Sequence, residues 1–460
     1  AVPGAPAGTA AGANAGTSTT AAGTGAAGGG TNAKTSGKGT KPGAAGSSTS
    51  GAGGASAVER LVASAPIFGG NAPCKPASLS EVPIGNVSTL SGVLGELFSP
   101  VTHALQVFVT SQNACGGLNG HRIKLYFDDD QGDPSTASTK VQAMIDTKHV
   151  LAFVGNIQAL TVDAVVPIIK KSGIPIIGSD VTNNTWFTNP LMFPQAGSQQ
   201  SVSYGFLLGA TQYFHVKNLG LFWCIEVPRA CEQGARAFKE LAPKMGTVVK
   251  KDLQVSLTQP SYVQQCLDLK NAGVEAVGMI MDAASMRRIA RSCTQVGYFP
   301  KVLGHPLGVG YEKQFLGDKW LGNAYVPLST FGWMANTTPA EKYYQAMVKR
   351  YDPGFDSGGA ASLGWTSAAL LVAASANLSP ENPTTQQFLD TLWQFQGQKF
   401  TELGGLTGPK FYGKDKNPKV PYCLYSSVSN ADDTGWASYT SKPTCTDLYA
   451  PSDPSGGKFQ

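Results

Sequence analysis

The residue types that most often carry chemistry are sparse in this 460-residue sequence and form no familiar catalytic pattern. Neither a Gly-x-Ser-x-Gly nucleophile turn nor a His-Glu-x-x-His zinc motif occurs. The histidines lack the spacing of metal ligands and are scattered along the chain: His103, His121, His149, His215 and His305. The sequence therefore nominates no nucleophile, no metal and no cofactor, and indicates a protein that is not an enzyme.

Two short motifs resemble loops that bind phosphate or calcium, but each lacks an essential residue. Residues 408–414 fit Gly-x-x-x-x-Gly-Lys, yet Asp415 stands where a hydroxyl would hold magnesium, so we expect a turn. A calcium loop opened by Asp128 would end at Thr139 instead of at a glutamate. We expect Asp133 of this acidic cluster to cap the next helix instead.

Eight cysteines give the clearest chemical signal. No two are spaced as Cys-x-x-Cys, which argues against a structural zinc site and a thioredoxin-type motif. Proximity along the chain suggests four disulfides, although sequence alone does not fix their connectivity: Cys74–Cys115, Cys224–Cys231, Cys266–Cys293 and Cys423–Cys445. Disulfides persist outside the cytosol, so we expect an extracytoplasmic protein, with buried free thiols in a cytosolic protein as the alternative.

Residues 1–57 are almost entirely Ala, Gly, Ser, Thr and Pro, which predicts a disordered tether without a core. This stretch contains Lys34, Lys38 and Lys41, so three of the five net positive charges fall outside the predicted folded part. No basic stripe with interleaved aromatic residues predicts nucleic-acid binding. No run of eighteen apolar residues predicts a membrane span, and we expect any leader to have been removed. The tether would suit attachment to a membrane or cell wall through the N-terminus, and equally secretion.

From Glu81 onward, short β-rich runs alternate with amphipathic stretches of helical length, which is typical of parallel sheets covered by helices on both faces. One series runs over residues 82–177 and a second over residues 199–303, so two sheets are expected. Three further helices are predicted near residues 339–351, 363–376 and 384–393. The Gly- and Pro-rich end from Gly404 is expected to be mostly irregular.

The run from Asn113 to Asp130 carries Gly-Gly, Asn-Gly, a strand and Asp-Asp in that order, and resembles the branched-chain amino acid binding protein family. These are type I periplasmic binding proteins. Order and spacing keep matching through residues 153–156, 172–179 and the downstream strands, so the resemblance covers roughly residues 81–445. The resemblance implies an α/β Venus-flytrap with two Rossmann-like lobes and a hinge. The ligand would lie between the lobes and pass to the permease of an ABC transporter.

The resemblance also implies the lobe borders. Lobe one would comprise residues 81–195 and 326–396, and lobe two residues 196–325 and 397–446. Residues 447–460 would form a C-terminal tail. Crossovers near these borders would act as hinges.

The first ligand-binding segment that the resemblance implies follows a strand and opens a helix. In the family, this segment grips an α-carboxylate with backbone amides and a serine hydroxyl, as helix N-termini favour anions. In this chain Ala159 takes the place of the serine, with Asn156, Leu160 and Thr161 around it. The second implied contact is Thr182, with Asp180 and Asn183 beside it. A loop-capping role for Thr182 and Asn183 fits these residue types equally.

The family's glutamate for the ligand ammonium is replaced by Leu307. Burying an ammonium there without an acceptor is costly, so a plain amino acid is disfavoured unless another acid reaches it. Asp282, at the end of a lobe-two strand, is the candidate substitute, and is equally suited to cap the helix that follows. Leu97 and Phe98 lie near segments that approach the cleft in the family, and would either line an apolar pocket or belong to the core.

These observations predict a solute-binding protein that captures a small carboxylate, aromatic acid or amide and hands it to an ABC permease. A branched-chain or other amino acid is the alternative ligand. A sensor or receptor module without a transport role is the alternative function, and an enzyme ranks behind both.

Overall fold

The computed structural model describes residues 55–309, 317–334, 336–430, 435–440 and 442–450. The tether predicted for residues 1–57 lies outside the described residues up to Gly54. The first helix, α1 (Ala57–Ser64), begins inside the predicted tether because a capping box starts it: the Ser56 hydroxyl accepts from Glu59 N, and the Glu59 carboxylate accepts from Ser56 N.

The first sheet has five parallel strands in the order β2-β1-β3-β4-β5. The strands are β1 (Leu79–Ser88), β2 (His121–Asp129), β3 (Ala152–Asn156), β4 (Ile176–Ser179) and β5 (Met192–Phe193). The connecting helices are α3 (Pro100–Asn113), α4 (Pro134–Lys148) and α5 (Val162–Ser172). The chain moves outward from β1 to β2 and then back across β1 to β3. Right-handed crossovers therefore place α3 on the face opposite α4 and α5.

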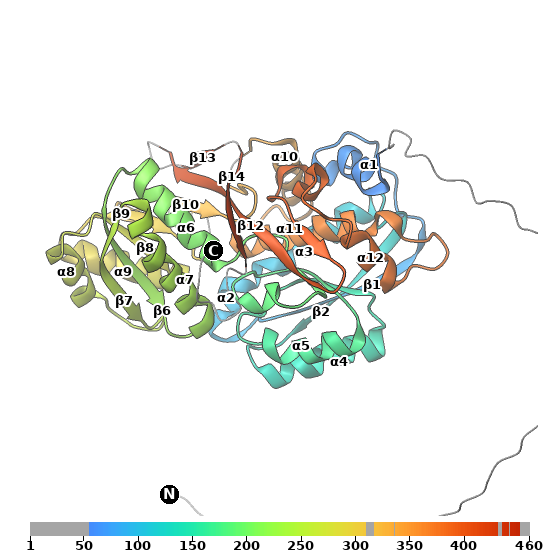
Figure 1. Cartoon of the computed structure of the whole chain (residues 1–460), viewed down its shortest axis with the longest axis horizontal. Coiled ribbons are helices and arrows are strands. Elements are labelled where there is room, and N and C mark those ends of the chain that lie inside the picture. The colour runs from blue at the N-terminus through green and yellow to red at the C-terminus, as the bar shows by residue number, and fades with distance from the viewer. Residues whose placement is uncertain (1–54, 310–316, 335, 431–434, 441, 451–460) are drawn as a thin grey trace, which may run out of the picture. The chain divides into compact units, whose positions relative to one another are not determined.

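Three later helices return to this first half of the fold: α10 (Pro339–Tyr351), α11 (Gly359–Ala374) and α12 (Thr385–Leu392). α11 packs against α3, β3 and β4, and Figure 1 shows it crossing behind the centre of the molecule. Gly359–Asn377 is long and apolar enough to cross a bilayer, but 94% of this stretch is buried. It is therefore the core helix of the first half.

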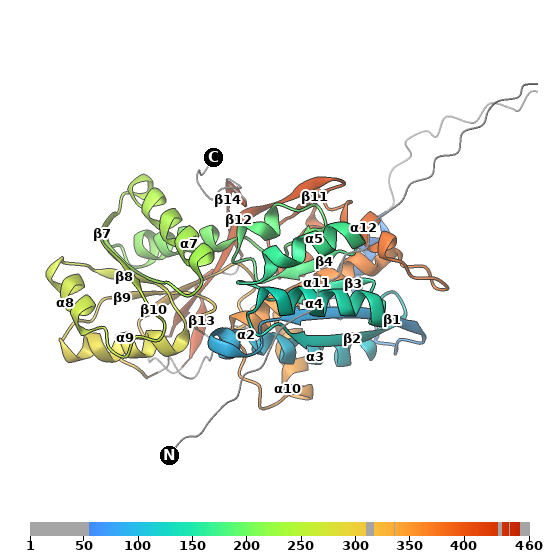
Figure 2. The ribbon, with the colours of Figure 1, turned by 90° about the horizontal axis from the view of Figure 1, so that it is seen from below.

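The second sheet has nine strands, seven of them in the order β11-β12-β10-β9-β8-β6-β7, with β13 and β14 also paired to β12. The strands are β6 (Asn218–Cys224), β7 (Val248–Val255), β8 (Ala276–Ile280), β9 (Lys301–Gly304), β10 (Ala324–Leu328), β11 (Phe411–Gly413), β12 (Lys416–Ser429), β13 (Trp436–Ser438) and β14 (Thr444–Ala450). The helices are α6 (Gln199–Leu208), α7 (Pro228–Leu241), α8 (Val263–Asn271) and α9 (Ala283–Gln295). Figure 2 shows α7 on one side of this sheet and α8 and α9 on the other. The α/β fold with two sheets is confirmed.

The C-terminal segment differs from the irregular end predicted from Gly404. Four strands, β11 to β14, occupy most of residues 411–450, and β14 enters the predicted tail at residues 447–460. The prediction was wrong because the prolines of β12 argue against a strand. The strand tolerates Pro421, which lacks an N–H, because Pro421 lies at a register shift between β12 and β14. The turn predicted at residues 408–414 is mostly wrong, because residues 411–413 form β11; the turn of the β11–β12 hairpin lies at Lys414 and Asp415, with Asp415 at φ 56°.

The structure pairs all eight cysteines in the four pairs that proximity along the chain suggests. Cys74–Cys115 fastens the segment before β1 to the end of α3. The other three lie in the second half, where they join β6 to α7, α8 to α9, and β12 to β14. The second half is therefore the more heavily cross-linked of the two.

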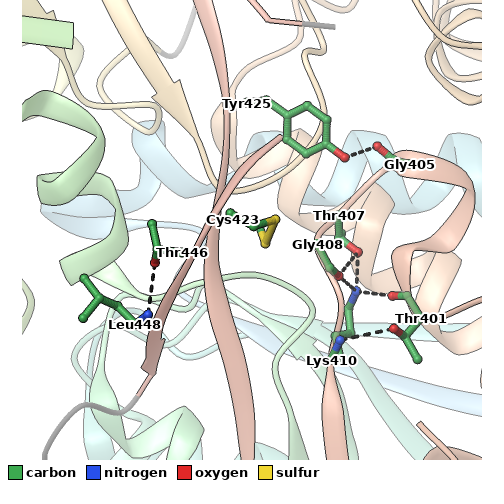
Figure 3. Close-up of a disulfide and its surroundings, with 10 residues drawn as sticks. Thr401, Gly405, Thr407, Gly408, Lys410, Cys423, Tyr425, Thr446 and Leu448 are labelled. Carbon is green, nitrogen blue, oxygen red and sulfur yellow. Dashed lines mark hydrogen bonds between the residues drawn. A yellow bond between two sulfur atoms is a disulfide. The ribbon is translucent and has the colours of Figure 1, made fainter. Parts of the chain in front are cut away.

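Lys410 is buried beside the disulfide that joins β12 to β14 (Figure 3). Its Nζ donates to the carbonyl oxygens of Thr401 at 2.7 Å and Gly408 at 2.9 Å, and to the Thr407 hydroxyl. Burial lowers the pKa of Lys410 well below its usual value. Three acceptors surround Lys410 Nζ, so Lys410 fastens the loop before β11.

Candidate functional site

Two adjoining hollows lie where strands from both sheets end, which is where open α/β sheets form their crevices. The polar hollow is lined by the loop after β4, the start of α6, the residues after β9 and β10, and the start of α11. The apolar hollow is lined by α2 (Gly95–Phe98), α7 and the ends of β6 and β8. Their cavity volumes are about 20 and 50 Å³, and they share four residues: Thr182, Gln199, His305 and Leu307. We call the two together the cleft.

Most of the predicted ligand contacts line this cleft: Leu97, Phe98, Ala159, Asp180, Thr182, Asp282 and Leu307. Phe98 also belongs to the core, with 2% of its surface exposed. Asp282 fills both roles considered for it, because it lines the apolar hollow and also caps α9 by accepting from Ser285 N at 2.9 Å. Asp133 caps α4 as predicted.

The structure places the remaining predicted contacts away from the cleft: Asn156, Leu160, Thr161 and Asn183. The Thr161 hydroxyl donates to the Asp130 carboxylate at 2.6 Å and is fully buried. Leu160 lies on the surface, with 38% of its area exposed. Asn183 caps a short 3-10 helix by accepting from Thr185 N, which is the loop-capping role considered for it.

Asp180 is a buried carboxylate whose acceptors are already occupied. Its Oδ1 accepts from Thr182 N at 2.8 Å, the Thr182 hydroxyl at 2.6 Å and Trp186 Nε1 at 2.9 Å, and its Oδ2 accepts from Gln158 N at 2.6 Å. Burial raises the pKa of Asp180, and these hydrogen bonds oppose that shift. Val181 adopts φ 52°, a strained conformation for a β-branched residue. The Thr182 amide and hydroxyl, predicted to clamp a ligand carboxylate, thus donate to Asp180.

His305 and Gln199 form the opposite side of the cleft. Burial lowers the pKa of His305 to about 3, so the imidazole is neutral. Its Nδ1 accepts from Leu307 N at 3.1 Å, and its Nε2 lies 2.8 Å from Gln199 Oε1. Gln199 Nε2 and the Ser198 hydroxyl are buried without a hydrogen-bond partner among the described residues.

Two helices begin at the polar hollow without a side-chain cap. Ser198 precedes α6 and Gly358 precedes α11, and neither helix end has a side-chain hydrogen bond to its first amides. Helix N-termini carry partial positive charge and unpaired N–H donors, which favour an acceptor or an anion. The ionisable carboxyl groups lining the cleft are Asp180 and Asp282, and no lysine or arginine is among its described lining residues.

Ser198, Gln199 and His305 carry no motif that sequence reasoning would select. The available signal is a polar run at residues 195–201 directly before the apolar part of α6. Polar residues buried at a helix start are unusual unless they bind something. Among the described residues, no group of three or more His, Cys, Asp or Glu side chains could hold a metal ion.

A family model described as periplasmic binding protein matches residues 81–432 of the chain. The fold is similar to a possible leucine/isoleucine/valine-binding protein from Rhodopirellula baltica SH 1, with 16% identity, a TM-score of 0.65, and coverage of 80% of this chain and 99% of that one. A fatty acid ABC transporter substrate-binding protein from Thermomonospora curvata gives 17% identity, a TM-score of 0.63, and coverage of 82% and 95%.

A third similar structure is a solute-binding protein of an ABC transporter from Rhodopseudomonas palustris BisB5, in complex with 3,4-dihydroxy benzoic acid. It shares 14% identity at a TM-score of 0.62, with coverage of 79% of this chain and 96% of that one. Such low identities establish the fold and leave the ligand open. No curated protein sequence matches the chain.

Proposed function

The chain belongs to the periplasmic binding protein family, the extracytoplasmic solute-binding proteins of ABC transporters, and we propose that its ligand is a small apolar molecule with one hydrogen-bond acceptor end. A carboxylate such as an aromatic acid, or an amide, meets this description. The bound protein would hand the ligand to an ABC permease. The observation that carries the proposal is that two buried donors without a partner, on Ser198 and Gln199, belong to residues lining the more polar of two adjoining, mostly apolar hollows.

The polar hollow supports an acceptor at one end of the ligand. The Ser198 hydroxyl and Gln199 Nε2 are buried donors without a partner, and an unsatisfied buried donor costs about 1–3 kcal/mol. A ligand oxygen would satisfy them and would also meet the N-termini of α6 and α11. Leu97, Phe98 and Leu307 would pack against the apolar body of the ligand. Family members with bound benzoate and 3,4-dihydroxy benzoic acid are consistent with such a ligand.

A plain amino acid is the alternative, and the cleft supports it less well. Leu307 stands at the position of the family's ammonium-binding glutamate. Asp180 already accepts four hydrogen bonds, so Asp282 would be the ammonium partner. A related protein from Streptococcus pneumoniae does hold isoleucine. Amino acids therefore serve as the comparison ligands in the test.

We place the lobes as the family resemblance implies, with one adjustment. Lobe one would comprise residues 81–195 and 329–396, and lobe two would comprise residues 196–328 and 397–446. Because β10 pairs within the second sheet as far as Leu328, we move that hinge crossover to just after Leu328. Ligand binding would shift the equilibrium between the open and closed forms toward the closed form, to the extent that the ligand binds the closed form more tightly than the open form. Residues before α1 would tether the protein to a membrane or cell wall.

A thermal-shift screen confirmed by calorimetry tests the ligand class. We expect benzoate or benzamide to raise the melting temperature of the full chain in a concentration-dependent way, because a ligand that binds only the folded state stabilises it. Leucine and isoleucine at the same concentrations should give no shift. Stabilisation by isoleucine and by neither aromatic compound would contradict the proposal.

A further inference from the structure

We propose that His305 sets the ligand class of the cleft by holding the Gln199 side-chain amide in one orientation, so that the site binds acceptor ends and rejects amines and ammonium groups. The inference rests on the proposed function and deepens it. It makes His305 a positioning residue and Gln199 the residue that contacts the ligand.

The tautomer of His305 follows from its two hydrogen bonds. The Leu307 backbone N–H can only donate, so Nδ1 of His305, 3.1 Å away, must be an unprotonated acceptor. A neutral imidazole carries one proton, which therefore lies on Nε2. His305 is buried, with 6% of its surface exposed, and burial disfavours a second proton.

The tautomer in turn fixes Gln199. Because His305 Nε2 donates, the amide atom 2.8 Å away must be the oxygen Oε1, and Nε2 of Gln199 is left as the free end. If the Gln199 amide were flipped, its N–H₂ group would face the N–H of His305 Nε2, and the hydrogen bond between the two side chains would be lost. The side chain of Gln199 packs against Gly234 of α7, where an added Cβ atom would come within 2.9 Å of Gln199 Nε2.

The free Nε2 of Gln199 therefore offers N–H donors to the cleft and has no acceptor to offer. The residue Gln199 lines both hollows, and its buried Nε2 has no hydrogen-bond partner among the described residues. The neighbouring Ser198, which lines the polar hollow, has an equally unpaired buried hydroxyl. A site built to donate to a ligand oxygen rejects an analogue that brings only donors, because polar groups then remain unpaired. Carboxylates and amides offer an oxygen that accepts from these donors, whereas a protonated amine brings only donors.

The replacement Gln199→Glu keeps the shape of the side chain and reverses its chemistry. One carboxylate oxygen still accepts from His305, while the other replaces the free N–H₂ with a charged acceptor. We expect calorimetry at neutral pH to show benzoate binding weakened by about 100-fold and benzylamine binding tightened relative to the original protein. The control is Gln106→Glu, on the exposed face of α3, which adds the same charge and should leave both affinities unchanged.

A second measurement reads the positioning role directly. We expect ¹⁵N NMR of the full chain to show His305 as the neutral tautomer protonated on Nε2. A proton on Nδ1 would overturn the inference, as would an unchanged preference for benzoate or benzamide over benzylamine in the folded Gln199→Glu variant. If the original protein binds neither benzoate nor benzamide, the proposed function itself fails. The two failures are therefore distinguishable.

Discussion

The two walls of the cleft use their buried polar groups in opposite ways. On the first wall, formed by Asp180 and Thr182 after β4, the polar groups bond to one another and to neighbouring backbone. On the second wall, formed by Ser198, Gln199 and His305, two donors are buried without a partner. Buried polar groups in folded proteins are almost always paired, and the two unpaired donors of the second wall belong to residues that line the cleft, so a ligand could pair with them.

Because of this contrast, we expect the first wall to contribute mainly to folding stability and the second wall mainly to ligand affinity. Replacements on the first wall should appear mainly as a loss of folding free energy, because they break bonds that exist without a ligand. Replacements on the second wall should appear mainly as a change in affinity. The predictions that follow challenge this division, beginning with the largest expected effect.

Asp180→Ala should cost about 2–4 kcal/mol of unfolding free energy, because Gln158 N, Thr182 N and Trp186 Nε1 lose a shared acceptor inside the protein. Urea unfolding of the ligand-free chain measures the loss. The matched replacement on the second wall is Ser198→Ala, which removes an unpaired buried hydroxyl and should therefore cause no loss of stability, and a gain of up to about 1–3 kcal/mol. Equal losses from the two variants would contradict the division between the walls.

His305 should make the stability of the protein depend on pH. Burial lowers its pKa to about 3, below its value in the unfolded chain, so between about pH 3 and 6.5 the unfolded state binds a proton that the folded state does not. Stability therefore rises with pH through that window. Relative to His305→Gln, the original protein should lose about 2 kcal/mol between pH 7.5 and pH 5.

Urea unfolding of both proteins across the window provides the measurement. The raised pKa of Asp180, which lines the same hollow, acts in the opposite direction, but it is present in both proteins and cancels in the difference. Asp282, the other carboxyl group that lines the cleft, is also present in both proteins. A difference between the two proteins that stays constant with pH would show that the pKa of His305 is the same in the folded and the unfolded chain, and would weaken the contrast between the walls.

Much of the first wall could be predicted from the sequence, whereas the second wall could not. The alternation of strands and helices is a local property, and so are the short spacings that suggest the cysteine pairs, so both could be predicted. The segment at Thr182 was found through its place in a family pattern. That pattern could not show that Asp180, two residues earlier, takes both donors of Thr182.

The second wall depends on contacts between distant parts of the chain. Gln199 and His305 are 106 residues apart and meet because α6 starts beside the end of β9. No periodicity or motif encodes that meeting. The strands after Gly404 were missed for a related reason, since β12 pairs with β10, almost 100 residues earlier, and carries prolines that argue locally against a strand.

The smallest predicted effect concerns an ion pair that bridges the two halves at the edge of the cleft. Arg229 at the start of α7 pairs with Asp163 of α5, and the Asp163 carboxylate also accepts from the Thr185 hydroxyl. Both partners are well exposed, at 61% and 47% of their side-chain surface. Exposed ion pairs contribute little and are screened by salt, so Arg229→Ala should weaken ligand binding by no more than about fivefold at low ionic strength.

The loss of ligand affinity in Arg229→Ala should arise in the closed form, because opening the lobes would separate α7 from α5. The Arg229–Asp163 ion pair would then be absent from the open form of both proteins. The loss of affinity should therefore disappear in calorimetry at about 1 M salt, where charges are screened within about 3 Å. Lys239→Ala is the matched control, since Lys239 lies on the same helix but pairs with Asp252 within the second half. Its removal should leave affinity unchanged at both ionic strengths. Equal weakening by the two variants would mean that the Arg229 pair stabilises α7 itself and has no part in closing the cleft.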